Sequence, residues 1–146
     1  HRRSYKSSVE LKDQFEFKEP DITLFGISSA RFECIEAVKI LKTKGIKINF
    51  VNILWLKPNK FNKKQIDSLK KSKLGLVVDS SYEISGASRS IAYDLSVISK
   101  KMVYALGMED KIRRLGGKNV LLAVLQNMEI RSNRPLYPSI SIQINA

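Results

Sequence analysis

Short apolar runs separate longer amphipathic segments along the middle of the chain. Four of these runs are rich in β-branched, leucine or aromatic residues, a composition typical of strands. The third is apolar at nearly every position, as expected for a central strand buried on both faces of a parallel sheet. The predicted strands cover Asp21–Gly26, Ile46–Leu54, Leu74–Asp79 and Met102–Leu106.

Helical periodicity occupies the first interval between strands. Apolar side chains recur every three residues from Phe32 to Leu41, which predicts a helix that ends near Thr43. The Ser28–Ser29 pair offers a side-chain oxygen to cap the start of this helix. Gly45 suits the left-handed turn that commonly follows a helix.

Two further helices are predicted downstream. Asn62 and Gln65 resemble a capping box, so they should start a short surface helix with a narrow buried face. Ser85–Ser99 returns to helical spacing, with apolar positions running from Ile91 to Ile98. Strands and helices therefore alternate as far as the fourth strand.

The pattern loosens beyond Asp110. Residues 119–128 fit a last helix, and Ile140, Ile142 and Ile144 alternate as a terminal strand would. The whole pattern predicts an α/β fold, with three layers (α/β/α) around a mostly parallel, mixed sheet of about five strands.

Composition is compatible with one main domain. The chain has 146 residues, 43% of them hydrophobic, which is enough to bury one core. The sequence contains neither an apolar stretch of membrane-spanning length nor an apolar secretory segment behind His1. We expect a cytoplasmic protein without a membrane partner. Because the chain begins without Met, we also expect it to be a piece of a longer polypeptide.

The formal net charge of +12 admits two interpretations. Clustered lysines can bind a polyanion such as nucleic acid through counterion release. Alternatively, the lysines, which recur among isoleucine and asparagine residues, reflect a compositional bias and occupy solvated helix faces. The second interpretation fits their spread along the chain better, so nucleic acid is the less favoured partner.

The scarcity of two residue types excludes several chemistries. Cys34 is the only cysteine and His1 the only histidine. These two residues cannot form an internal disulfide or supply the ligands of a zinc site. His1 is also placed where chain ends are usually poorly ordered, so Ser/His or Cys/His catalysis is not expected. A zinc site and independent hydrolytic catalysis are therefore not expected in this chain.

Candidate interface or ligand residues follow the predicted strands. In an open α/β sheet, ligands bind beyond the carboxyl ends of the strands. Asp79 and Glu83 could bind magnesium or act as acid and base there, although capping the next helix or pairing with lysines is the commoner role. Trp55 could anchor a partner or pack in the core. The candidates are Asn52, Trp55, Asp79, Glu83 and Gly86.

Several short motifs occur in a recognisable order. They are Leu56-Lys57-Pro58, Val77-Val78-Asp79, Gly86 followed by Ile91-Ala92, and Ala105 to Asp110. Together they resemble the C-terminal domain of transketolase-type thiamine enzymes. The resemblance covers about residues 21–110 and is closest to the beta subunit of the decarboxylating component of pyruvate or 2-oxoacid dehydrogenases. His1-Arg2, with Tyr5 after them, resembles the segment that leaves the preceding pyrimidine-binding domain.

The resemblance implies a parent enzyme that uses thiamine diphosphate and magnesium. It implies no complete active site in this piece, and no catalytic, cofactor-binding or metal-binding residue. It implies a linker at residues 1–19, the transketolase-like domain at 20–111 and a basic extension at 112–146. The piece would serve subunit assembly, in a homodimer or an alpha/beta heterotetramer, with an acyltransferase core as a further partner. The family's usual Asp and Arg in the second-strand phrase are Asn52 and Leu54 here, and an acidic residue is replaced by Ser90.

Two alternatives stay open beside this interpretation. Corresponding domains occur in 2-oxoacid ferredoxin oxidoreductases and in deoxyxylulose phosphate synthase, and a lone domain does not separate these relatives. The rival from another class is a basic α/β binding module for nucleic acid or another polyanion.

Overall fold

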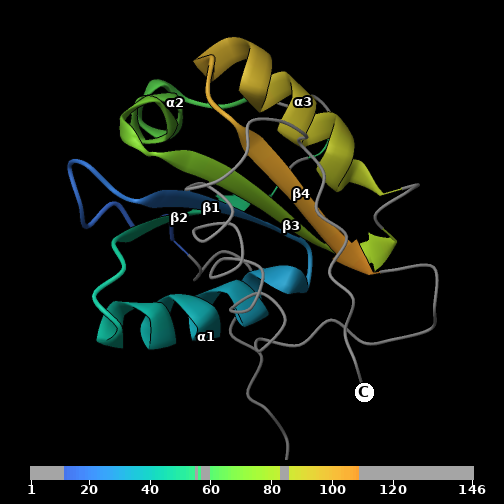
Figure 1. The fold of residues 1–146 in the computed structure, drawn as a ribbon. Coiled ribbons are helices and arrows are strands. Elements are labelled where there is room, and N and C mark those ends of the chain that lie inside the picture. Colours follow the sequence, from blue (N-terminus) through green and yellow to red (C-terminus); the bar gives the residue numbers. More distant parts are fainter. Residues whose placement is uncertain (1–11, 55, 57–59, 83–85, 109–146) are drawn as a thin grey trace, which may run out of the picture.

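The computed structural model describes residues 12–54, 56, 60–82 and 86–108. Within these ranges four strands form one sheet in the order β2-β1-β3-β4, and every pair of neighbours is parallel (Figure 1). In chain order the elements are β1 (Ile22–Ile27), α1 (Ala30–Thr43), β2 (Ile48–Ile53), α2 (Lys63–Lys71), β3 (Leu74–Tyr82), α3 (Ala87–Ser99) and β4 (Val103–Met108).

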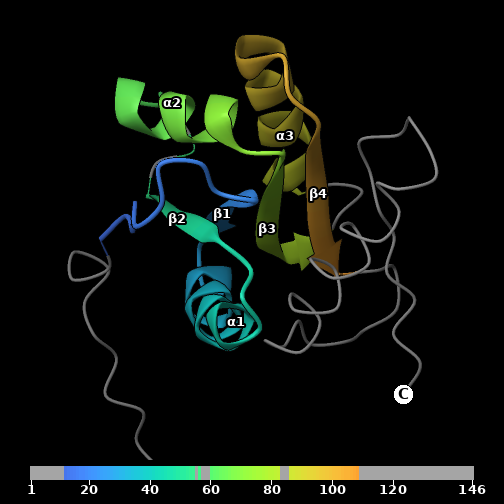
Figure 2. The same ribbon diagram turned by 60° about the vertical axis from the view of Figure 1, so that its left-hand side comes forward.

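The sheet is the middle of three layers. Helix α1 covers one face, and α2 and α3 cover the other (Figure 2). Alternate side chains of the strands enter two separate cores. Leu24 and Leu76 pack on the α1 side, whereas Phe25 and Val77 pack on the side of α2 and α3. The predicted α/β/α architecture is confirmed.

The central strands are β1 and β3. Ile22 of β1 lies opposite Ile48 of β2 on one side and opposite Leu74 of β3 on the other. All six residues of β1 are buried, as expected for a strand covered on both faces. The central position predicted for the third strand is confirmed, because β3 lies between β1 and β4.

The expected count of about five strands is approximate. The described residues contribute four parallel strands and one isolated antiparallel bridge, between Gln14 and Phe50. The predicted last helix at 119–128 and the predicted strand at 140–144 lie outside the described residues.

The start of α1 differs from the prediction. Ser29 is at the cap position, but its backbone is helical and its side chain makes no capping hydrogen bond. A capping side chain needs an extended backbone at this position, which Ser29 does not adopt. The preceding Ser28 has a left-handed backbone (φ 53°), and its carbonyl accepts a hydrogen bond from Arg31 Nε at 2.7 Å. The predicted left-handed Gly45 is confirmed at φ 76°.

The last turn of α3 also differs from the prediction. Ile91 and Leu95 are buried as expected, but Ile98 is 51% exposed. The buried row continues through Ser99, because a helix turns about 100° per residue and Ser99 lies four positions after Leu95. The Ser99 hydroxyl donates to the Leu95 carbonyl at 2.6 Å, so it is satisfied inside the core.

Helix α2 is fixed at both its start and its buried face. The predicted capping box is confirmed: the Asn62 side chain accepts from Gln65 N–H, and the Gln65 side chain accepts from Asn62 N–H. The buried face carries hydroxyls as well as Leu69. Thr23 Oγ1 of β1 lies 2.9 Å from Ser68 Oγ and 2.5 Å from Ser72 Oγ.

Asn49 of β2 connects this hydroxyl cluster to the residues before the sheet. Its Nδ2 donates to Ser68 Oγ and to the Phe17 carbonyl, both at 2.9 Å. Its Oδ1 accepts from Phe17 N–H at 3.0 Å. Gln14 bonds Phe50 of the same strand through two backbone hydrogen bonds, at 2.7 and 2.9 Å. Strand β2 is therefore covered along part of its outer edge, where an unpaired strand would be open to pairing with other chains.

We predict that Asn49→Ala lowers the free energy of unfolding by about 2–4 kcal/mol, since three hydrogen bonds are lost at a buried position. Urea unfolding of the 146-residue chain measures the change. Thr43→Val is the matched control, because it removes a single exposed hydrogen bond to the Ile40 carbonyl. Equal losses in the two variants would show that the Asn49 network does not stabilise the fold.

Asp21 joins the amino ends of the strands. Burial alone would raise the pKa of its carboxyl. The Lys47 backbone N–H and the Lys73 ammonium together lower the pKa by more than burial raises it, so it lies below its ordinary value of 3.8. The Lys47 N–H donates to Oδ2 at 2.9 Å, and Lys73 Nζ lies 2.9 Å from Oδ1. The ionised carboxylate is thus the form that holds this end of the sheet together.

The pH dependence of this contribution follows from the lowered pKa. The folded state binds the proton less tightly than the unfolded state, so the stabilisation is complete well above pH 3.8 and is lost as the pH falls through the lower folded pKa. We expect Asp21→Asn to cost about 1–2 kcal/mol at neutral pH and almost nothing in strong acid. Urea unfolding across this range measures the difference, and a cost independent of pH would contradict the assignment.

Candidate functional site

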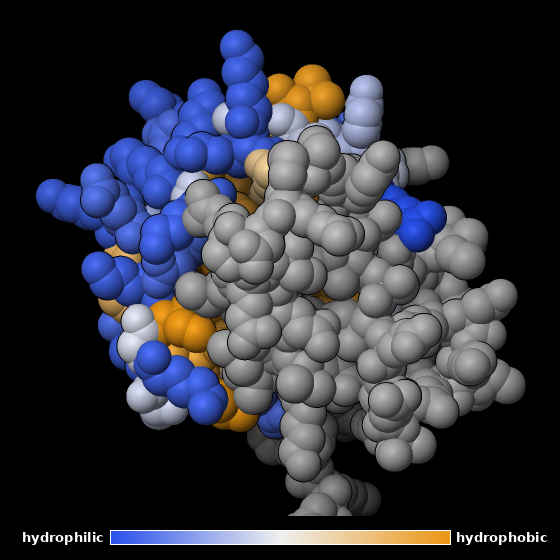
Figure 3. Space-filling model, in the orientation of Figure 1, coloured by the Kyte–Doolittle hydropathy of each residue, from blue (hydrophilic) through white to orange (hydrophobic). Residues whose placement is uncertain are grey.

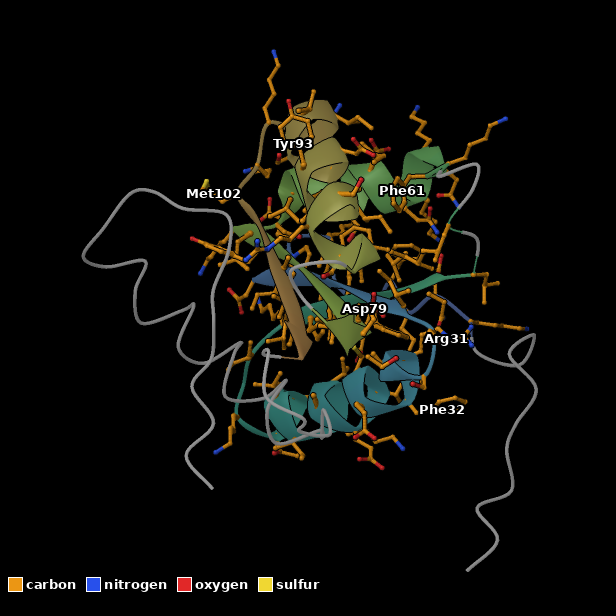
Figure 4. The ribbon with its side chains drawn as sticks, turned by 90° about the vertical axis from the view of Figure 1, so that its right-hand side faces the viewer. Arg31, Phe32, Phe61, Asp79, Tyr93 and Met102 are labelled. Atoms are coloured by element: carbon orange, nitrogen blue, oxygen red, sulfur yellow. The ribbon has the colours of Figure 1, made fainter. Side chains whose placement is uncertain are left out.

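The carboxyl edge of the sheet is where the candidate residues gather. The chain leaves β1 for α1 on one face and leaves β3 for α3 on the other, so the order of connection reverses between these two strands. Open α/β sheets usually place their ligand sites at such a reversal. Figure 4 shows Asp79 at this edge, between the first turn of α3 and the first turn of α1, where Arg31 is labelled.

Asn52 lies in β2 on the α1 side of this edge. It pairs with Gly26 of β1, whose missing side chain leaves room for α1: a Cβ there would come within 3.1 Å of Arg31 Cα. The Asn52 side chain is 7% exposed, and neither its Oδ1 nor its Nδ2 has a hydrogen-bond partner. Its backbone N–H donates to Asp13 Oδ1 at 2.7 Å. A buried unpaired amide costs stability, and such positions are expected at functional sites, so Asn52 stays a candidate site residue.

Asp79 lies in β3 and is 5% exposed. Its Oδ1 accepts from Ser81 N–H at 3.2 Å, and its Oδ2 accepts from the Ser81 hydroxyl. The cap of α3 is Gly86, and among the described residues the ion pairs formed by lysines involve Glu16 and Asp21, not Asp79. The strand continues to Tyr82, and the local Ser81 satisfies the Asp79 carboxylate, so a capping or ligand-binding role for Asp79 stays a prediction.

Gly86 and Ser88 define the α3 side of the edge. Gly86 is half-buried and extended (φ −80°, ψ 165°), and the helix begins after it without a side-chain cap. Ser88 is fully buried, and its hydroxyl has no hydrogen-bond partner. Trp55 and Glu83 lie outside the described residues, so their roles stay predictions.

Sequence reasoning missed Ser88. A serine early in a helix looks like an ordinary capping or solvent-facing residue, and only the packing of α3 on the sheet buries it. Asn52 and Ser88 are the buried side chains without a hydrogen-bond partner in the described part of the chain, and they lie on opposite faces of the same sheet edge. The two residues do not form one constellation.

The described residues offer few reactive or metal-binding side chains. Cys34 is fully buried, and its burial together with the neighbouring Glu33 charge raises the pKa of its thiol strongly, so the thiol stays protonated. No group of three His, Cys, Asp or Glu side chains suited to a metal ion occurs in the ranges that the structure covers. None of the helices described is both long and apolar enough to cross a membrane.

Comparison with known proteins identifies the class of domain. The chain matches the model of the family described as "Transketolase, C-terminal domain" over residues 13–130. That match extends over most of the chain, so the chain belongs to the transketolase C-terminal domain family. The sequence resemblance is thereby confirmed at the level of the family. No curated protein matches the chain.

Two solved structures share the fold. A chain of "Split gene transketolase, inactive beta4 tetramer" superposes with a TM-score of 0.65 at 22% sequence identity, covering 77% of this chain and 41% of its own. A 2-oxoglutarate:ferredoxin oxidoreductase from Magnetococcus marinus, with 2-oxoglutarate, coenzyme A and succinyl-CoA bound, superposes with a TM-score of 0.64 at 13% identity, covering 86% of this chain and 20% of its own. This chain therefore spans less than half of either protein.

We predict that Asn52→Leu raises the free energy of unfolding of the 146-residue chain by about 1–3 kcal/mol, since an apolar side chain of similar size removes an unpaired buried amide. Asn52→Asp should have the opposite effect, because it buries a charge at the same position. Urea unfolding of both variants tests this. A loss of stability in Asn52→Leu would mean that the amide has a partner in solution.

Proposed function

We propose that this chain is the subunit-interface domain of a thiamine diphosphate-dependent enzyme, of the 2-oxoacid dehydrogenase or transketolase type. Membership of the transketolase C-terminal domain family supports this proposal. It is supported further by the description of one structural relative as a beta4 tetramer, since that relative is an assembly of like chains. The domain would contribute contacts between subunits and no complete active site.

The observation that carries the assembly role is the outer face of α3. Large apolar side chains here remain in solvent: Tyr93 is 69% exposed, Val97 59% and Ile98 51%, and Met102 just beyond the helix is 40% exposed. Tyr93 and Val97 are four residues apart, so they lie side by side on the helix surface. Figure 3 shows a small group of hydrophobic atoms at the top of the molecule, over α3, and Figure 4 places Tyr93 and Met102 on the same side. Such patches mark interaction sites when they are contiguous.

The remaining features of the parent follow from the same proposal. Thiamine diphosphate and magnesium would bind elsewhere in the parent, which would be a homodimer or an alpha/beta heterotetramer in the cytoplasm. Pyruvate or another 2-oxoacid would be the substrate, and an acyltransferase core could dock on the assembly. Residues 1–19 would connect to a preceding pyrimidine-binding domain, with the transketolase-like domain at 20–111 and a basic extension at 112–146.

The assembly role is tested in the complete parent protein with Val97→Lys. A lysine buried at a subunit contact loses its hydration without gaining a partner, so we expect the dissociation constant between subunits to rise about tenfold or more. Analytical ultracentrifugation measures it. Ile40→Lys is the matched control, because Ile40 is 41% exposed but lies on α1, on the opposite face of the sheet. If both variants assemble like the unaltered protein, the outer face of α3 is not a subunit contact.

A further inference from the structure

A second surface has a different chemical character. Helix α2 and the residue two positions before its cap carry exposed lysines, and Figure 3 shows hydrophilic side chains gathered over this helix. A single carboxylate, Asp67, lies among them and is partly exposed. The lysines of this surface, called here the α2 lysine face, are Lys60, Lys63, Lys64, Lys70 and Lys71.

Most of these lysines have no partner of opposite charge within the described part of the chain. The ion pairs among the described residues join Lys42 to Glu16 and Lys73 to Asp21, and neither involves the α2 lysine face. Lys64 makes a cation–π contact instead, because its Nζ lies over the Phe15 ring, 5.0 Å from the ring centroid. Glu16 and Asp21 are thus used for internal pairing, whereas the lysines of α2 are left in solvent.

The position of Lys63 opposes the stability of its own helix. Lys63 and Lys64 occupy the first turn, where the helix dipole is positive, and no acidic residue is present there to offset them. Lys70 and Lys71 are in the last turn, where the dipole favours them. Helix stability therefore explains the lysines of the last turn only. A negative charge from a partner would relieve the repulsion between the first-turn lysines and the positive end of the helix dipole.

The outward row of α2 has a mixed pattern of charge. Lys63, Asp67 and Lys70 are spaced four and three residues apart, so they lie on one side of the helix. Lys63 and Lys70 are about 10.5 Å apart along the axis, since each residue rises about 1.5 Å. A partner helix with carboxylates seven residues apart and a cation between them matches this row charge for charge.

Three features of the surface disfavour a nucleic acid. Asp67 would repel a phosphate backbone that crosses the middle of the row. All the cations on α2 are lysines, whereas arginine makes the bidentate contacts that phosphates favour. The nearby aromatic rings are occupied, because Phe61 packs edge-on against Phe25 at 5.8 Å and Lys64 covers Phe15. No exposed ring on α2 is available to stack on a base.

We propose that the α2 lysine face docks an acidic helical segment of a partner protein, through the row formed by Lys63, Asp67 and Lys70. The recognition is electrostatic, so it depends on ionic strength and on the order of charges in the partner. This inference does not rest on the apolar face of α3 or on the proposed assembly function. Its test therefore fails or succeeds independently of subunit assembly.

The test uses the 146-residue chain and fluorescence anisotropy at low salt. The probe is a labelled helical peptide with Glu at positions i and i+7 and Lys at i+4, compared with a scrambled peptide of the same composition. The test variant is Lys63→Gln/Lys70→Gln. The control variant is Lys39→Gln/Lys44→Gln, which removes the same net charge from exposed positions in and just after α1.

We expect the test variant to bind the patterned peptide about five- to tenfold more weakly, and the control variant to change affinity by less than about twofold. The unaltered chain should bind the patterned peptide more tightly than the scrambled one. Folding is checked separately, since the test variant should be no less stable than the unaltered chain once Lys63 is neutralised at the positive helix end. Equal effects of the two double variants, or tighter binding of a DNA duplex than of the peptide, would overturn the proposal.

Discussion

The pairing of β1 with β3 at the centre of the sheet is the contact on which the other elements depend. Both strands are buried on two faces, so each face needs a covering layer of helix. Helix α1 supplies one layer, and α2 with α3 supplies the other. Because the chain turns to opposite faces after β1 and after β3, the same pairing also places the reversal of connections at the carboxyl edge of the sheet.

The elements with a strong physical signal could be predicted from the sequence. Leu74–Asp79 was assigned to a central strand because its positions are apolar without alternation, and the capping box of Asn62 and Gln65 is an explicit local interaction. The wrong predictions fall at positions where the local sequence pattern was weaker than a competing contact in the folded structure. Ser29 resembles a cap, but the left-handed Ser28 places it in a helical backbone conformation. Ile98 resembles a core residue, but Ser99 takes the buried position.

The candidate edge could be predicted only in outline. Sequence position placed Asn52 and Asp79 at the ends of neighbouring predicted strands, which parallel pairing brings to one edge. The state of each side chain depends on three-dimensional packing, which sequence spacing does not contain. Asp79 is satisfied by Ser81, whereas Asn52 and Ser88 are left without partners. The hydroxyl cluster of Thr23, Ser68 and Ser72 also requires α2 to lie across β1, and no local sequence motif predicts that contact.

Two kinds of surface lie on one side of the sheet, an apolar face on α3 and a charged face on α2. The central proposal is that the domain supports assembly of an enzyme whose chemistry lies elsewhere. The most direct measurement compares the full-length parent, co-expressed with its partner subunit, with a version that lacks residues 1–146. Subunit assembly and thiamine diphosphate-dependent consumption of 2-oxoacid are followed together. The account predicts that assembly and activity are both lost on truncation, whereas unchanged assembly and activity in the truncated protein would contradict it.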